Sequence, residues 1–130
     1  MIAVDTNILV RLVTGDDQSQ VERILALAAE ERFFVSLTVL METEWVLRSR
    51  FGYDRSTIYK AFEALPNLVS MDFEDEEGVA WALDRFEIAG ELADYLHIVA
   101  ARKIGRFVTF EKNLTDRAGQ NAPARTATVP

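Results

Sequence analysis

The chain has no cysteine and a single histidine, His97, among its 130 residues. The lack of cysteine excludes disulfide bonds, thiolate-bound zinc, iron–sulfur clusters and cysteine nucleophiles. With one histidine, His-rich metal sites and most serine–histidine triads are implausible, and we expect His97 to be a core or interface residue rather than a ligand. The side chains left for chemistry are carboxylates, of which the sequence has 21.

A long apolar run is also missing, because charged residues interrupt every stretch before it reaches the roughly 20 residues that a membrane span needs. The segment from Met1 to Asp5 has no basic residue and ends in an acid, so we expect no secretory leader and a cytoplasmic location. Hydrophobic residues make up 49% of the chain and the mean hydropathy is +0.02, which excludes a disordered chain. We predict one domain, residues 1–130, that can bury a core.

Basic residues are few, since 14 Lys and Arg stand against 21 Asp and Glu and the net charge is −7. This balance argues against passive binding of nucleic acid. From Arg102 to the C-terminus, however, six bases accompany only two acids. A basic C-terminal quarter on an acidic body fits an anionic polymer at one surface and a metal ion that offsets acids elsewhere. Two unrelated solvated faces would explain the distribution equally well.

Short apolar runs alternate with segments of helical periodicity along the chain. We expect strands at 2–4, 33–35, 68–71 and 107–109, with a possible fifth at 126–129. Helices are expected from about Ile8 to Val13 and at 17–31, 38–50, 55–65, 74–86 and 92–104, with Thr38 capping the third and Pro66 ending the fourth. Continuous apolar strands between helices predict a three-layer α/β/α domain with a short, mostly parallel central sheet.

Polar residues follow the predicted strands, where ligands of parallel sheets bind. Asp5 directly follows the first strand, Ser36 follows the second, and Glu111 comes two residues after the fourth. Capping of the next helix is the alternative role of Asp5. A surface position in a loop is the alternative for Glu111 and for Asp116.

Glu42 interrupts an apolar helical face. At about 100° per residue it falls between Trp45 and Val46, while Glu44 and Arg48 mark the side that we expect to face solvent. A carboxylate among apolar neighbours is costly to bury unless a charge meets it. A salt bridge or a position at the edge of the helix is the alternative to a functional role.

Asp94 interrupts a helix that is apolar nearly all round. It projects between Ile98 and Ala101 and lies in the first turn, where the helix dipole favours an anion by only up to about 1 kcal/mol. We therefore expect Asp94 to need a cation. Several carboxylates that meet at strand ends repel one another unless a hard cation such as Mg²⁺ or Mn²⁺ neutralises them. Such an ion activates water against a phosphate, so the predicted chemistry is phosphodiester hydrolysis.

Four segments in this order resemble the PIN-domain ribonucleases, and most closely their VapC-type toxins: Asp5-Thr6-Asn7, Glu42, Ala93-Asp94-Tyr95-Leu96-His97 and Thr109-Phe110-Glu111. The resemblance covers essentially the whole chain. It implies the catalytic carboxylates Asp5, Glu42, Asp94 and Glu111, with Asp5 and Asp94 as ligands of Mg²⁺ or Mn²⁺. It also implies the supporting residues Asn7, Ser36 and Thr109, with Glu91 as a secondary candidate. Glu111 replaces the usual aspartate, which leaves open whether it contacts the metal directly or through water. Whether Glu111 or Asp116 completes the site is a second open question.

The resemblance further implies a metal-dependent endoribonuclease that acts on RNA such as tRNA or rRNA, forms a homodimer and is silenced by a VapB-like antitoxin. Two alternatives remain. One is a non-catalytic scaffold with the same fold, whose acids are neutralised by salt bridges. The other is an aspartyl phosphatase with Asp5 as nucleophile, which Asn7 disfavours because such enzymes have a second aspartate at that position.

Overall fold

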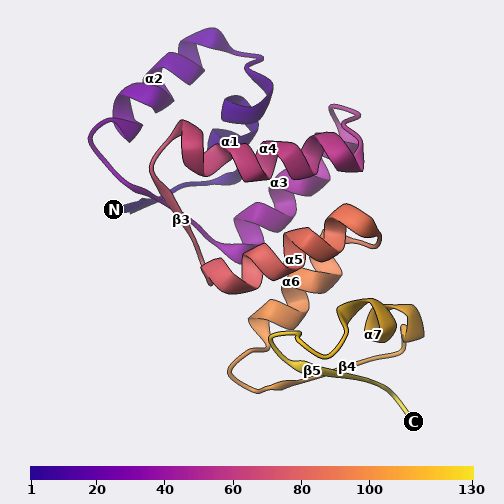
Figure 1. Ribbon diagram of the computed structural model, residues 1–130. Coiled ribbons are helices and arrows are strands. Elements are labelled where there is room, and N and C mark those ends of the chain that lie inside the picture. The colour runs from indigo at the N-terminus through magenta and orange to yellow at the C-terminus, as the bar shows by residue number, and fades with distance from the viewer. The chain divides into compact units, whose positions relative to one another are not determined.

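The structure, a computed structural model, describes all residues from 1 to 130. Strands and helices alternate along the chain (Figure 1), in the order β1 (Ile2–Ala3), α1 (Thr6–Thr14), α2 (Gln18–Ala28), β2 (Phe33–Val35), α3 (Leu37–Ser49), α4 (Arg55–Leu68), β3 (Met71–Phe73), α5 (Glu76–Ile88), α6 (Leu92–Ala100), β4 (Arg106–Thr109), α7 (Lys112–Ala118) and β5 (Arg125–Thr128). None of the helices combines the length and hydrophobicity that a membrane span requires.

The chain divides into two compact units, Met1–Glu74 and Asp75–Pro130. The first unit contains a parallel sheet in the order β1-β2-β3, with Phe33 of β2 opposite Ile2 and Met71. The side chains of Phe33 and Val35 are 0% and 1% exposed, so β2 is the buried centre of this sheet. Strands this short can form a stable sheet because both faces of the apolar central strand are covered.

The polar residues that follow these three strands share one edge of the sheet, because parallel strands end on the same side. Asp5 follows β1, Ser36 follows β2 and Glu74 follows β3. Glu74 is held there, since its Oε1 accepts a hydrogen bond of 2.9 Å from the backbone N–H of Leu37 at the start of α3. In the first unit, polar residues therefore lie at the carboxyl ends of the parallel strands, as the sequence predicted.

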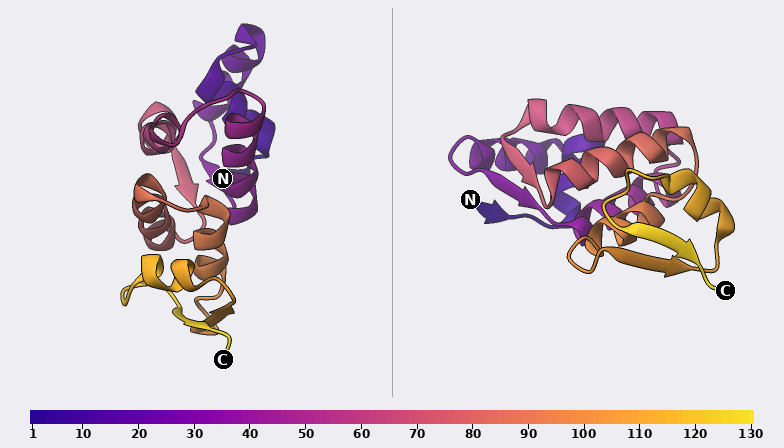
Figure 2. Two further views of the ribbon diagram at one scale, coloured as in Figure 1. Left: turned by 90° about the vertical axis from the view of Figure 1, so that its right-hand side faces the viewer. Right: turned by 60° about the horizontal axis from the view of Figure 1, so that its bottom comes forward.

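The second unit pairs β4 with β5 in parallel, from Arg106 opposite Arg125 to Thr109 opposite Thr128. The two strands run side by side in the same direction (Figure 2), and α7 connects them. Helices α5 and α6 pack on each other. Asp75, the N-cap of α5, accepts two hydrogen bonds from Arg102, at 2.6 and 3.0 Å.

All strand pairs are parallel, as predicted, but the strands form two separate ladders where one central sheet was expected. The third strand also begins later than predicted, at Met71, because α4 continues through Pro66 to Leu68. A proline near the end of a helix removes only one backbone bond. The buried side chains of Leu65 and Val69 favour this extension, since they hold the last turn against the core.

Two other helices differ from the sequence prediction. Helix α6 ends at Ala100 rather than at 104, and a turn closes with the Gly105 N–H bonded to the carbonyl of Ala101. Helix α7 was not predicted, because seven residues with only Leu114 and Ala118 buried give too short an apolar stripe to detect.

Candidate functional site

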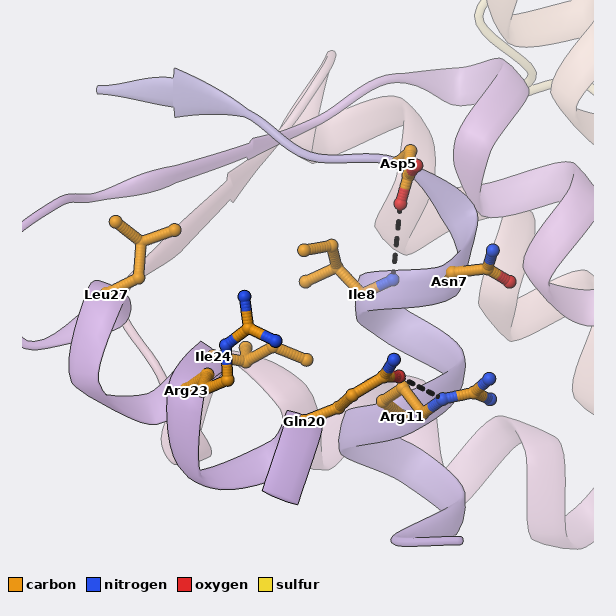
Figure 3. A pocket seen from close by; sticks show the side chains of 8 residues that line it. All are labelled: Asp5, Asn7, Ile8, Arg11, Gln20, Arg23, Ile24 and Leu27. Atoms are coloured by element: carbon orange, nitrogen blue, oxygen red, sulfur yellow. Dashed lines mark hydrogen bonds between the residues drawn. The ribbon is translucent and has the colours of Figure 1, made fainter. Parts of the chain in front are cut away.

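Asp5 is the N-cap of α1, which was its alternative role. Its Oδ1 accepts a hydrogen bond of 3.3 Å from the backbone N–H of Ile8 (Figure 3). Capping satisfies one of the free N–H groups at a helix start. The bond uses one carboxylate oxygen of an exposed side chain, so the second oxygen stays available for a ligand. Capping and ligand binding are therefore compatible at Asp5.

Glu42 is anchored to α1 by its neighbour in space, Thr6. The Thr6 hydroxyl donates a hydrogen bond to Oε1 of Glu42, and Thr6 itself is 7% exposed. Because Thr6 follows Asp5 directly in the chain, this bond holds Glu42 of α3 near the start of α1. Within the first unit, two of the predicted carboxylates are thus fixed at the same region.

The face of α3 on which Glu42 lies was predicted wrongly. Glu42 is exposed, whereas Glu44, predicted on the solvent side, is 2% exposed and pairs with Arg48 at 2.8 Å. The buried residues of α3 are Leu40, Thr43, Glu44, Val46 and Leu47, and all of them except Val46 follow the spacing i, i+3, i+4, i+7. Trp45, on which the sequence prediction relied, is 50% exposed. The i,i+4 ion pair with Arg48 explains how a glutamate can occupy the buried arc.

Ser36 and Asn7 were predicted as supporting residues of the first unit. Ser36 is the N-cap of α3, and its Oγ accepts a hydrogen bond of 3.2 Å from Val39 N–H. The predicted cap was Thr38, whose hydroxyl instead lies 3.1 Å from that of Ser36. Asn7 is exposed and lines a pocket together with Asp5.

Asp94 lies in the first turn of α6 and is half-buried. Burial raises the pKa of Asp94 above its ordinary value of 3.8, and the negative charges of Glu91 and Glu111 raise it further, while His97 and Arg117 oppose the shift. Three carboxylates of the second unit are therefore close enough to interact. The positive charges around Asp94 do not cancel the combined effect of burial and repulsion.

Glu91 and Glu111 occupy equivalent positions as the N-cap residues of α6 and α7, and neither caps its helix through its side chain. Glu111 is oriented by the predicted supporting residue Thr109, whose Oγ1 accepts a hydrogen bond of 3.0 Å from Glu111 N–H. Asp116 is exposed on α7 and is absent from the charges that shift the pKa of Asp94. The structure thus places Glu111, and not Asp116, in the electrostatic neighbourhood of Asp94.

The turn before α6 depends on contacts among Gly90, Tyr95 and Arg117, and the sequence did not reveal these contacts. Tyr95 is fully buried; its hydroxyl donates to the Ala89 carbonyl at 2.7 Å and accepts from Arg117 Nε at 3.0 Å. Gly90 has a φ of +91°, and a Cβ there would lie 2.5 Å from the Tyr95 hydroxyl oxygen. Only glycine fits this turn, which positions Glu91 and Asp94. The signal available in the sequence was the tyrosine itself, because a buried hydroxyl needs partners.

His97 is exposed on α6, so of its two expected positions, in the core or at an interface, the structure excludes the core. The helix is less completely buried than its sequence indicates, since Ala100 is exposed too. The charge of His97 lowers the pKa of Asp94, one turn away. His97 therefore opposes the rise in the pKa of Asp94, but the two side chains do not form part of a metal-binding cluster.

The donor chemistry of these residues fits a hard divalent cation. Neither unit by itself gathers three or more Asp, Glu or His side chains in an arrangement that could hold a metal ion. The available donors are carboxylate oxygens in both units, which Mg²⁺ and Mn²⁺ prefer and which zinc sites seldom use alone. The repulsion at Asp94 is also of the kind that a bound cation relieves.

A pocket of about 360 Å³ lies beside Asp5 (Figure 3). All of its lining residues come from the first unit, between β1 and the end of α2: Asp5, Asn7, Ile8, Arg11, Gln20, Arg23, Ile24 and Leu27. A second pocket of about 380 Å³, between α1 and α4, is lined almost entirely by apolar side chains.

The family model described as "PIN domain" matches residues 2–120. The match runs through both units and confirms the predicted α/β fold class with short, mostly parallel strands of the PIN type. No significant match to a curated protein or to a solved structure is found.

Proposed function

This chain belongs to the PIN-domain family, and we propose that it is a metal-dependent endoribonuclease. PIN domains are typically metal-dependent nucleases that use Mg²⁺ or Mn²⁺. The observation that supports this proposal most directly is the electrostatic repulsion that Asp94 of α6 experiences from Glu91 and Glu111, the N-cap residues of α6 and α7. Such a concentration of negative charge is unfavourable in the protein alone and favourable for binding a cation.

The proposed catalytic carboxylates are Asp5 and Glu42 of the first unit and Asp94 and Glu111 of the second, with Asp5 and Asp94 as metal ligands. A bound divalent ion would supply an activated water and offset charge on the phosphate. The chain's own contribution is orientation: Thr6 holds the carboxylate of Glu42, and Thr109 holds the backbone of Glu111. Asn7, Ser36 and Glu91 are the proposed supporting residues.

The scaffold alternative requires these acids to be neutralised by salt bridges. Asp5, Glu42, Asp94 and Glu111 form no ion pair, whereas Asp16, Glu31, Glu44, Asp72 and Asp75 each do. None of the four proposed catalytic carboxylates is therefore neutralised by a salt bridge. This pattern favours a catalytic domain over a scaffold.

The biological role that we propose is that of a toxin in a toxin–antitoxin pair, acting on tRNA or rRNA in the cytoplasm as a homodimer. This part of the proposal comes from the resemblance to VapC-type proteins. A VapB-like antitoxin could silence the site with an arginine, because a guanidinium fork can bind two carboxylate oxygens in place of the cation.

RNA cleavage by the purified protein tests the proposal. We expect cleavage with Mg²⁺ or Mn²⁺, none with EDTA, and a loss of at least about 100-fold for Asp5→Asn and Asp94→Asn, as for removal of a group that stabilises transition-state charge. Asp84→Asn is the matched control, since Asp84 is an exposed carboxylate of α5 in the same unit as Asp94. Undiminished cleavage by the Asp94→Asn protein would overturn the assignment.

A further inference from the structure

The pocket beside Asp5 has the size of a small-ligand site and is bounded by two helices. Its volume of about 360 Å³ falls within the range of roughly 300–1,000 Å³ that ligand pockets occupy. Asp5 is one of its lining residues, so a molecule bound there would touch a proposed catalytic carboxylate. The other lining residues are basic, uncharged polar or apolar, and each kind suits a different part of a ligand.

Two arginines line the pocket, and only one of them is engaged by the protein. Arg11 donates to Gln20 Oε1 at 2.6 Å and pairs with Asp16 at 3.2 Å. Arg23 has no hydrogen bond or ion pair. Figure 3 shows its guanidinium projecting from α2 into the pocket. An unpaired guanidinium beside an open space is suited to a phosphate, which it can bind through two parallel hydrogen bonds.

The lining of the pocket also includes an apolar wall and uncharged polar side chains. Ile24 and Leu27 of α2 and Ile8 of α1 supply the wall. Leu27 is 40% exposed, so the wall is open to a ligand. Gln20 Oε1 accepts from Arg11, so the Gln20 NH₂ group is the donor left to meet the edge of a base. A phosphate, an apolar face and a polar edge are together the features of one nucleotide.

We propose that this pocket holds the nucleotide next to the cleaved phosphodiester, with Arg23 as a positioning residue on its phosphate and Leu27 against its base. The inference rests on the proposed ribonuclease function and specifies its substrate. A base that enters the pocket must leave its helical stack. The substrate class is therefore RNA with an unpaired nucleotide beside the cleavage site.

Binding measured without cleavage tests the role of Arg23. A fluorescent single-stranded RNA oligonucleotide is titrated in EDTA at several salt concentrations, and its anisotropy gives Kd. Arg23→Gln is expected to weaken binding and to reduce the slope of log Kd against log salt by about 0.7, the value for one phosphate contact on a single strand. Lys60→Gln, an exposed cation of α4 outside the pocket, is the charge-matched control and should keep the slope.

A second pair of variants tests the apolar wall. Leu25 and Leu27 are 39% and 40% exposed on the same helix, but only Leu27 lines the pocket. Leu27→Glu should weaken RNA binding by about tenfold, as expected when contact with one base is lost. Leu25→Glu, which adds the same charge two residues away, should leave Kd unchanged. Equal effects of the two substitutions would contradict the proposal.

The outcomes separate this inference from the proposed function. If Arg23→Gln and Leu27→Glu impair binding but the wild-type protein does not cleave RNA with Mn²⁺, the pocket is an RNA-binding site, whereas the nuclease proposal and the placement of the nucleotide beside a cleaved bond both fail. If the wild type cleaves RNA and both variants bind and cleave equally well, the nuclease proposal stands and the pocket proposal fails. Weakened binding of an antitoxin peptide with unchanged RNA binding would assign the pocket to a protein ligand and overturn the inference.

Discussion

The hydroxyl of Thr6 donates a hydrogen bond to the carboxylate of Glu42, and this bond joins the first turn of α1 to α3. Thr6 follows Asp5, the N-cap of α1, so one dipeptide caps a helix and orients a carboxylate 36 residues away in the chain. Orientation of a carboxylate by a neighbouring donor is how the surroundings of metal ligands commonly tune them.

Removal of that donor should impair catalysis more than folding. We expect Thr6→Val to lower kcat by about tenfold, with little change in KM, because loss of a hydrogen-bond partner of a metal-binding group typically reduces activity by roughly 10–100-fold. Thr43→Val is the matched control, because Thr43 is fully buried and donates to the Val39 carbonyl at 2.7 Å rather than to a carboxylate. Single-turnover kinetics and thermal melts distinguish the two. Equal losses of activity in both variants would show that the effect is structural.

Asp94 should destabilise the protein at neutral pH when no metal is bound. Because burial raises its pKa above 3.8, the folded state binds the proton more tightly than the unfolded state, and stability falls as pH rises through this interval. Asp94→Asn should therefore raise the Tm at pH 7, and the gain should disappear below pH 3.8. Mn²⁺ should raise the Tm of the wild type and not that of the variant.

Asp72→Asn should change the Tm at pH 7 in the direction opposite to that of Asp94→Asn. The Arg32 guanidinium lowers the pKa of Asp72, so its stabilising contribution is present above the ordinary pKa and is lost as pH falls. We expect this variant to lower the Tm at pH 7 and to approach the wild type in acid. If both variants shifted the Tm in the same direction, the assigned electrostatic environment of Asp94 would be wrong.

Glu111 and Asp116 can be told apart by paired substitutions. Glu111→Gln should reduce cleavage and also lower the pKa of Asp94, because Glu111 is one of the charges that raise it. Asp116→Asn should alter neither quantity. NMR titration of the labelled Asp94 carboxyl carbon measures the shift independently of activity. A larger effect from Asp116→Asn would identify that residue as the fourth carboxylate.

Gly90 should be indispensable for the turn that carries Glu91 and Asp94. Gly90→Ala is expected to lower the free energy of unfolding by more than the roughly 1–2 kcal/mol of a left-handed residue, since its Cβ would also contact the Tyr95 hydroxyl. Gly105→Ala is the control, because Gly105 has a φ of +81° and open space around its Cβ position. Denaturant unfolding compares the two, and equal losses would mean that the contact has no cost.

The sequence alone determined that apolar strands alternate with helices and pair in parallel, and that Asp5 and Ser36 follow two of them, whereas the third strand was predicted at 68–71 and lies at Met71–Phe73. Apolar runs bounded by polar residues specify such elements locally, which explains why Asp5 and Ser36 were found at strand ends. The burial of α3 could not be read in this way, because Val46 and Trp45 are apolar and yet Glu44 is more buried than Trp45. The ion pair with Arg48 allows Glu44 to be buried, and this pair forms only when α3 is folded and packed.

Only the tertiary structure brought Glu91, Asp94 and Glu111 into one electrostatic group and set Arg23 beside Asp5. Glu111 is 17 positions from Asp94 in the chain, and Arg23 is 18 positions from Asp5. Helical and strand periodicities reach only a few residues along the chain, whereas Coulomb forces and pockets depend on distance in space. A sequence fixes the kinds of groups that are available, and the folded chain decides which of them meet.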